Sequence, residues 1–207
     1  MKQEITIVTP NDYSAITLKQ YLALQRDLKA YEGDKEAVTA TLFYHLCGVS
    51  PDLLRKIDTQ TFTQISDRLF SFIAKDEFDL KRFVTIGGVE YGFEPDLSKM
   101  AYGAYVDISK YEKLDIDEDW KKIMGILYRP VSKKIGKLYE IEPYTGDEEV
   151  EHWNDVNMEV HFGALFFFIN LSKDLLNITL KSLTQTEGIA PNIKSILVES
   201  GEIISRL

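Results

Sequence analysis

Four marked helix starts within the first 75 residues constrain the fold of this chain more than any other feature. Thr17 and Gln20 have the spacing of a capping box, in which each side chain bonds the other residue's backbone N–H. Gly33-Asp34 ends that helix and caps the next, and Ser50-Pro51 is an N-cap followed by a first-turn proline. Asp58 caps a fourth segment. We therefore expect a layer of four short helices with short connections.

The pattern then changes to that of β-strands. "RFVTIGGVEYGF", residues 82–93, is two β-rich runs around Gly87-Gly88, which predicts a hairpin with a primed turn. A shorter alternating run, "EITIVTP" at residues 4–10, predicts a strand near the N-terminus. Residues 117–128 return to helical spacing. That helix should end by Tyr128 or Arg129, because Pro130 disfavours the helical conformation for the residue before it.

The stretch "GILYRPVSKKIGKLYEIEPYTG", from Gly125 to Gly146, follows directly. We interpret it as a helix exit, a basic turn over Lys133–Lys137 and a short extended segment closed by Pro143. An acidic loop, "TGDEEVEHWND", comes next, with five carboxylates and no Lys or Arg.

The most apolar part of the chain lies after this loop. Its core run from Val160 to Leu171 has twelve residues, whereas a membrane span needs about twenty. It predicts a buried central helix, and residues 190–207 predict a last amphipathic helix. The expected fold class is α+β, mainly α: a helical layer followed by a small β-hairpin and a buried central helix. We expect one domain over 1–207, with a helical subdomain at 14–76 and an α+β part at 77–207.

The net charge of −9 on 207 residues limits the partners of the protein. Binding to nucleic acid or to an anionic membrane face needs a basic surface, so we expect neither partner. Acidic solubility or a basic partner fits the charge better. Cys47 is the one cysteine, so no intramolecular disulfide can form and a reducing compartment is expected.

The aspartates at 115, 117 and 119 begin like a calcium loop, but the pattern fails further on. Its sixth place needs glycine and holds Trp120, and its twelfth needs glutamate and holds Ile126. Gly136-Lys137 likewise lacks the rest of a phosphate-binding loop. The three histidines lack zinc-motif spacing. His152 beside Glu151 in the acidic loop could act as a base, although a solvated loop histidine is the more common case. We predict a protein that is not an enzyme and needs no metal or cofactor.

Arg129 is the charged residue that stands out. In one interpretation it is a cation at a helix C-terminus whose guanidinium reaches the last carbonyls. In another, it pairs with a carboxylate of a partner or of the acidic loop. Tyrosines around it would suit an interface, although half-buried tyrosines at a core edge are as common. The predicted interface residues are Tyr128, Arg129, Pro130, Tyr139 and Tyr144 here, and Leu18, Tyr21 and Leu22 on the first helix.

The order of phrases "LKQYLALQ", "LFYHLCGVS", "GVEYGFEPDL", "YGAYVDI", "ILYRPV", "YEIEPY" and "FGALFFFINL" resembles proteins from the structural-gene regions of tailed bacteriophages, over residues 15–175. In general style the chain is similar to tail-assembly chaperones, which are acidic, largely helical and free of cofactors. The resemblance implies a chaperone that binds a phage structural protein, such as the tape-measure or another tail protein, in the host cytoplasm during assembly.

An all-helical chaperone would not contain the hairpin expected at Gly87-Gly88. Two alternative functions therefore stay open. One is a minor structural component of the virion, in the connector or baseplate. The other is a cytoplasmic protein-binding module.

Overall fold

The structure, a computed structural model, describes residues 6–75, 77–110 and 119–169. The chain divides into two compact units, Met1–Glu77 with Lys81–His161, and Phe78–Leu80 with Phe162–Leu207. Each unit is described by itself below. The expected single domain with parts 14–76 and 77–207 stays a prediction, because a compact unit of contacts is not by itself an independently folding domain.

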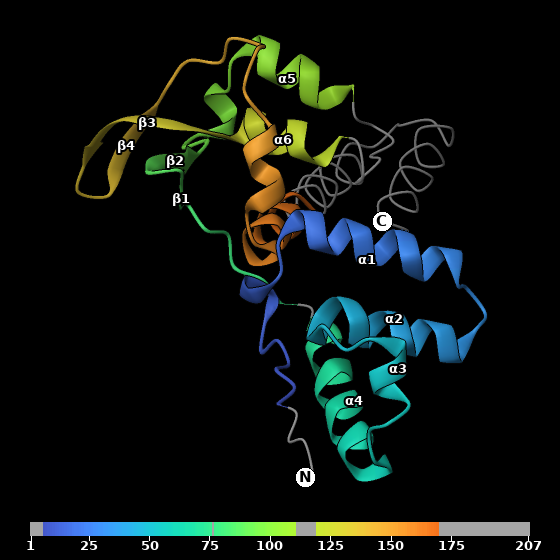
Figure 1. Ribbon diagram of the computed structural model, residues 1–207. Helices are drawn as coiled ribbons and strands as arrows, with labels where there is room; N and C mark the ends of the chain where they lie inside the picture. The colour runs from blue at the N-terminus through green and yellow to red at the C-terminus, as the bar shows by residue number, and fades with distance from the viewer. Residues whose placement is uncertain (1–5, 76, 111–118, 170–207) are drawn as a thin grey trace, which may run out of the picture. The chain divides into compact units, whose positions relative to one another are not determined.

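The helical layer of the first unit has the four helices expected from the sequence. They are α1 (Leu18–Ala30), α2 (Lys35–Cys47), α3 (Pro51–Leu54) and α4 (Thr59–Ile73), all labelled in Figure 1. The predicted caps are confirmed: Thr17 and Gln20 form the capping box, and Asp34, Ser50 and Asp58 each accept backbone N–H bonds at a helix start. Local side-chain chemistry therefore sets where these helices begin.

An apolar cluster joins α2, α3 and α4. Phe43 of α2, Val49, and Ile65 and Leu69 of α4 are buried together. Phe62 adds its ring, stacked on that of Phe43 at 5.3 Å between centroids. The helical spacing of the apolar residues in α4 places its buried side chains on one face, so α4 packs by that face.

The sheet also belongs to the first unit. It consists of β1 (Phe83–Ile86), β2 (Val89–Phe93), β3 (Tyr128–Ile135) and β4 (Leu138–Ile141), in the order β1-β2-β3-β4, with antiparallel pairing throughout. The predicted hairpin at Gly87-Gly88 is confirmed, because both glycines have positive φ, 58° and 84°, as a primed turn requires.

Two expectations about strands were wrong. Residues 6–10 form no strand, and residues 4–5 lie outside the described residues. A strand exists only where a second strand pairs with it, and no described strand pairs with residues 6–10. The expected basic turn over Lys133–Lys137 is shorter than predicted, because Lys133 and Lys134 pair with β4 and extend β3. The turn itself is Gly136, with φ of 60°, and Lys137.

Between the two hairpins lie α5 (Tyr102–Ser109) and α6 (Trp120–Leu127). Helical spacing places Trp120, Ile123, Met124 and Leu127 on one side of α6, and all four are buried. Gly125 and Ile126 are buried as well, so α6 is enclosed on more than one side. The helix ends at Leu127, as the proline at position 130 predicted.

A buried histidine joins α6 to the segment that follows the acidic loop. The Trp120 indole donates to Nδ1 of His161 at 3.1 Å, and Nε2 of His161 lies 3.1 Å from the carbonyl oxygen of Trp153, in the 3₁₀ helix η3 (Glu151–Asp155). Because an indole can only donate, Nδ1 is the acceptor and Nε2–H donates to that carbonyl. His161 is therefore neutral. Its burial lowers its pKa from 6.5 to about 4.

The predicted central helix runs over the described residues 158–169 and is buried at Gly163 and Ala164. In the second unit, Phe78 packs its ring against those of Phe162 and Phe166, at 4.8 and 5.4 Å. In the part of the chain that the structure describes, none of the helices is long and apolar enough to cross a membrane. The last helix, expected at 190–207, lies outside the described residues.

Replacing Gly163 by alanine tests the close approach of the central helix to residues 78–80. An added Cβ would collide with the backbone carbonyl oxygen of Asp79. We expect Gly163→Ala to lower the free energy of unfolding by about 1–3 kcal/mol, although alanine favours helices. Gly103→Ala in α5 is the control, because its Cβ would meet Tyr144 at an ordinary 3.5 Å. Urea denaturation followed by circular dichroism gives both values. Equal effects would contradict the close approach.

His161 should make stability depend on pH. Above pH 6.5 the residue is neutral in both the folded and the unfolded chain, and its contribution is complete. As the pH falls from 6.5 towards 4, the unfolded chain takes up the proton first, so stability is lost, by at most about 3 kcal/mol. Denaturation of the protein and of His161→Gln across this range measures the difference. If the free energy of unfolding depends on pH in the same way in His161→Gln, His161 is not the group responsible.

Candidate functional site

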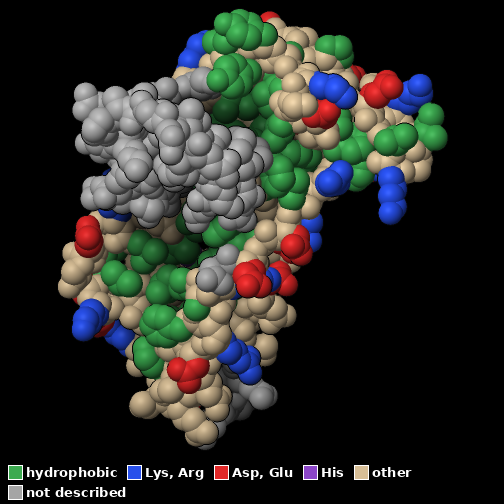
Figure 2. All heavy atoms as spheres, turned by 180° about the vertical axis from the view of Figure 1, so that it is seen from behind, with side chains coloured by type: hydrophobic (Ala, Val, Ile, Leu, Met, Phe, Trp, Pro, Cys, Tyr) green, Lys and Arg blue, Asp and Glu red, His purple; other side chains and the backbone are tan. Residues whose placement is uncertain are grey.

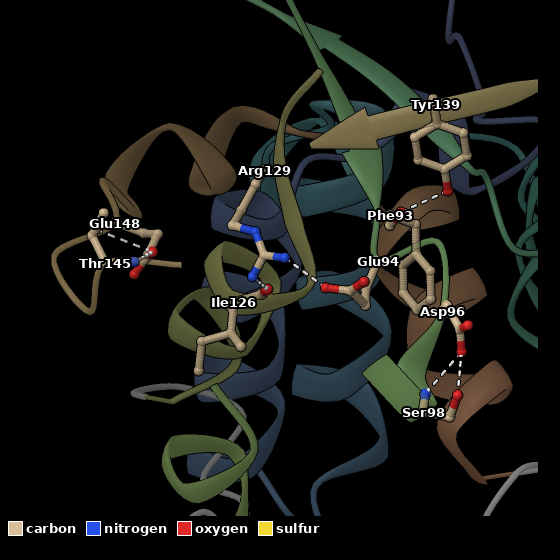
Figure 3. Close-up of polar contacts among 9 residues, drawn as sticks. All are labelled: Phe93, Glu94, Asp96, Ser98, Ile126, Arg129, Tyr139, Thr145 and Glu148. Atoms are coloured by element: carbon tan, nitrogen blue, oxygen red, sulfur yellow. Dashed lines mark hydrogen bonds and ion pairs between the residues drawn. The ribbon is translucent and has the colours of Figure 1, made fainter. Parts of the chain in front are cut away.

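Arg129 lies where α6 passes into β3 (Figure 3). Its side chain is buried. Its Nη1 donates to the carbonyl of Ile126 at 3.2 Å, in the last turn of α6. Its Nη2 donates to Glu94 at 2.5 Å, just past the end of β2. The contact to Ile126 is the one expected of a cation at a helix C-terminus, whose guanidinium reaches one of the last carbonyls of the helix. The carboxylate partner is Glu94, which sequence reasoning missed, because nothing local marks that glutamate as buried.

The tyrosines near Arg129 use their hydroxyls within the chain. Tyr128 donates to the carbonyl of Lys81 at 2.6 Å, and burial raises the pKa of Tyr128. Tyr139 donates to the carbonyl of Phe93 at 2.6 Å, as Figure 3 shows. Tyr144 donates to Asp107 at 2.5 Å. In this structure these hydroxyls therefore tie segments of the chain together.

A pocket of about 290 Å³ opens beside Arg129 and is called the acidic pocket below. It is lined by Tyr91, Gly125, Tyr128, Arg129, Pro130, Glu142, Pro143, Thr145, Asp147, Glu148 and Glu149. The structure thus brings together the predicted residues 128–130 and the acidic loop. Gly125 lets the loop approach α6, because a Cβ there would lie 2.9 Å from the side chain of Val150.

The carboxylates of the acidic pocket differ in their partners. Glu148 accepts the backbone N–H of Thr145 at 2.8 Å and closes the turn of the loop (Figure 3). Glu142, Asp147 and Glu149 are exposed, and none pairs with a cation in the described part of the chain. Their charge reaches the pocket wall: the pKa of Tyr91 is raised by burial first, and then by Glu149 and Glu142. The pocket therefore carries uncompensated negative charge.

The predicted residues of the first helix lie at different depths. Leu18 is fully buried, whereas Tyr21 and Leu22 are half-buried. Leu18 therefore packs inside the unit, and its side chain is not displayed to a partner in this structure. The interface role of these residues stays a prediction.

A second pocket, of about 480 Å³, lies between α1 and α2 and is called the helical pocket below. Its lining is mostly apolar and comprises Asp27, Tyr31, Ala37, Ala40, Thr41, Tyr44, His45 and Pro51. His45 and Asp27, 2.7 Å apart, join the two helices at its wall. Sequence reasoning identified the helical layer but missed this face, although Ala37, Ala40 and Tyr44 recur at helical spacing.

Glu151 and His152, the candidate acid–base residues, each contact other residues of the chain. Glu151 is held by Lys121 at 2.6 Å, and this bond lowers the pKa of Glu151. His152 packs its ring against Tyr91 and Trp153, and burial lowers the pKa of His152. Among the residues that the structure describes, no group of three or more His, Cys, Asp or Glu could hold a metal ion.

No family model matches the chain, and neither the curated proteins nor the solved structures contain a match.

The Arg129–Glu94 pair should contribute strongly to stability, because both side chains are at most 8% exposed. Glu94→Gln leaves a buried guanidinium without its counter-charge, so we expect a loss of about 3–5 kcal/mol in the free energy of unfolding. The matched control is Glu90→Gln. It removes the partner of Lys134 in a pair that is 37–40% exposed, and should cost at most about 1 kcal/mol. Chemical denaturation measures the free energy of unfolding of both variants. A similar loss in Glu94→Gln and Glu90→Gln would contradict the larger contribution expected of the buried pair.

Proposed function

We propose that the protein binds another protein through the helical pocket, and that it acts as a tail-assembly chaperone of a tailed bacteriophage. The observation that carries the proposal is an apolar hollow between two helices with tyrosines at its edge. Tyr31 and Tyr44 are 48% and 56% exposed, although both are large aromatic side chains. Exposed aromatic rings beside an apolar hollow are typical of protein-binding surfaces.

The shape and chemistry of the helical pocket suit an amphipathic helix. Ala37 and Ala40 are small, so a partner can approach the backbone of α2 closely between the tyrosine rings. A helix bound in a groove inserts apolar side chains that recur every three or four residues. Tyrosine is a suitable wall for such anchors, because its rigid ring loses little conformational freedom on binding.

A long, helical structural protein such as the tape-measure protein is the client that this surface would serve. Such a client exposes apolar stripes before it assembles, and covering them prevents aggregation. The net charge of −9 supports this role, because it keeps a complex with an apolar client in solution. Such a chaperone acts in the host cytoplasm and needs no cofactor or catalytic site.

The four-stranded sheet favours a second candidate, a minor structural component of the virion, since an all-helical chaperone has no such sheet. Mass spectrometry of purified virions beside the infected-cell lysate separates the two candidates. A fixed stoichiometry in particles favours the structural component. Abundance in the lysate and absence from particles favours the chaperone.

Substitution of Tyr44 tests the helical pocket directly. The protein is co-expressed with each tail and head protein of its source phage in turn, and the affinity for any client that co-purifies is measured by calorimetry. We expect Tyr44→Ser to weaken binding at least about tenfold, because aromatic anchors dominate interfaces. Tyr102→Ser is the matched control. Tyr102 lies on α5 and is 81% exposed, so binding should not change. Co-purification with none of the structural proteins would contradict the proposal.

A further inference from the structure

The outer part of the β3–β4 hairpin has no third strand beside it. Pairing between β2 and β3 covers only Tyr128, Arg129 and Pro130. After an irregularity between Val131 and Lys133, β3 pairs with β4 alone. In Figure 1 this hairpin extends as a two-stranded ribbon beyond β1 and β2. Residues 133–138 are called the hairpin tip below.

The hairpin tip combines exposed apolar side chains with free cations. Ile135 and Leu138 face each other across the turn and are 66% and 78% exposed. Lys134 is paired with Glu90, whereas Lys133 and Lys137 form no ion pair with a described residue. Figure 2 shows hydrophobic, basic and acidic side chains together on the projecting part of the molecule at the upper right.

The acidic pocket has the complementary chemistry. Its walls include Tyr91, Pro130 and Pro143, which can contact an apolar side chain. Glu142 and Glu149, which also line it, supply negative charge that no described cation neutralises. Its volume of about 290 Å³ suits a few side chains of a turn better than a whole helix.

We propose that the hairpin tip of one copy of the protein docks into the acidic pocket of a second copy. Leu138 would contact the apolar walls, and Lys137 would pair with the carboxylates at the rim. A second copy is favoured as the occupant because one chain displays both surfaces, with opposite charge. This inference uses residues outside the helical pocket, so it does not rest on the proposed client binding.

Docking within one copy is excluded by the geometry of the hairpin. Pro130 and Glu142 belong to the pocket and lie at the base of the ribbon, where the carbonyl of Pro130 accepts the N–H of Glu142 at 2.9 Å. Gly136 lies six residues beyond Pro130, which in a strand is about 20 Å. The contact therefore joins two different surfaces of two molecules. Contacts of this head-to-tail kind close into rings or grow into filaments.

Charge reversal on each surface tests the contact. The apparent molar mass of the full chain is measured by sedimentation over a wide range of protein concentration, at low and at high salt. We expect association that weakens with salt, and we expect Lys137→Glu and Glu149→Lys each to raise its dissociation constant at least about tenfold. Mixing the two variants should restore association, because each reversed surface then meets a complementary one.

The controls keep the result specific. Lys56→Glu changes the net charge by the same amount as Lys137→Glu, at an exposed lysine between α3 and α4, and should leave association unchanged. Leu138→Ser removes the apolar contact without a change of charge and should weaken association. A monomer at every concentration in low salt would overturn the proposal. So would variants that associate as the unmodified protein does, or a mixture that fails to recover. Tyr44→Ser should lose client binding and keep the association between copies. That result would show that the contact between copies is independent of client binding at the helical pocket.

Discussion

The two hydrogen bonds of His161 lie where distant parts of the first unit meet. They join Trp120, at the start of α6, to Trp153 in η3 through a neutral imidazole without access to water. The same region anchors α1, because the carbonyl of Val156 accepts the N–H of Leu18 at 2.9 Å. The start of α1 and the start of α6 are far apart in the sequence, and both therefore bond to residues 153–161. A buried polar group is costly unless satisfied, so this arrangement also disfavours alternatives that break it.

The binding surfaces that we propose consist of side chains that the core of the protein leaves exposed. The buried Arg129–Glu94 pair joins the end of α6 to the end of β2, and so fixes the base of the β3–β4 hairpin. The acidic pocket lies at that fixed base, whereas the hairpin tip projects beyond the sheet. A rigid base under an exposed tip is a suitable arrangement for a binding element, because little order has to be gained on docking.

The prediction for Arg129 shows how far sequence reasoning extends into the site. Its place at a helix end followed from Pro130, and its bond to the carbonyl of Ile126 is local, three residues away. Its partner Glu94 is 35 residues distant, and only the pairing of β2 with β3 brings the two together. The acidic pocket and the helical pocket were missed for the same reason, since each is lined by residues from separate segments.

The sequence by itself determined the features that depend on neighbouring residues. These are the helix starts with their capping side chains, the end of α6 before Pro130, and the hairpin at Gly87-Gly88, where backbone torsion preferences and short-range hydrogen bonds decide the outcome. Tertiary structure decided the rest. Lys133 and Lys134 became strand instead of turn because β4 pairs with them. Tyr128 is buried because Phe93 and Trp153 pack against its ring, and the carbonyl of Lys81 accepts its hydroxyl. Such contacts join distant segments, so no single stretch of the sequence encodes them.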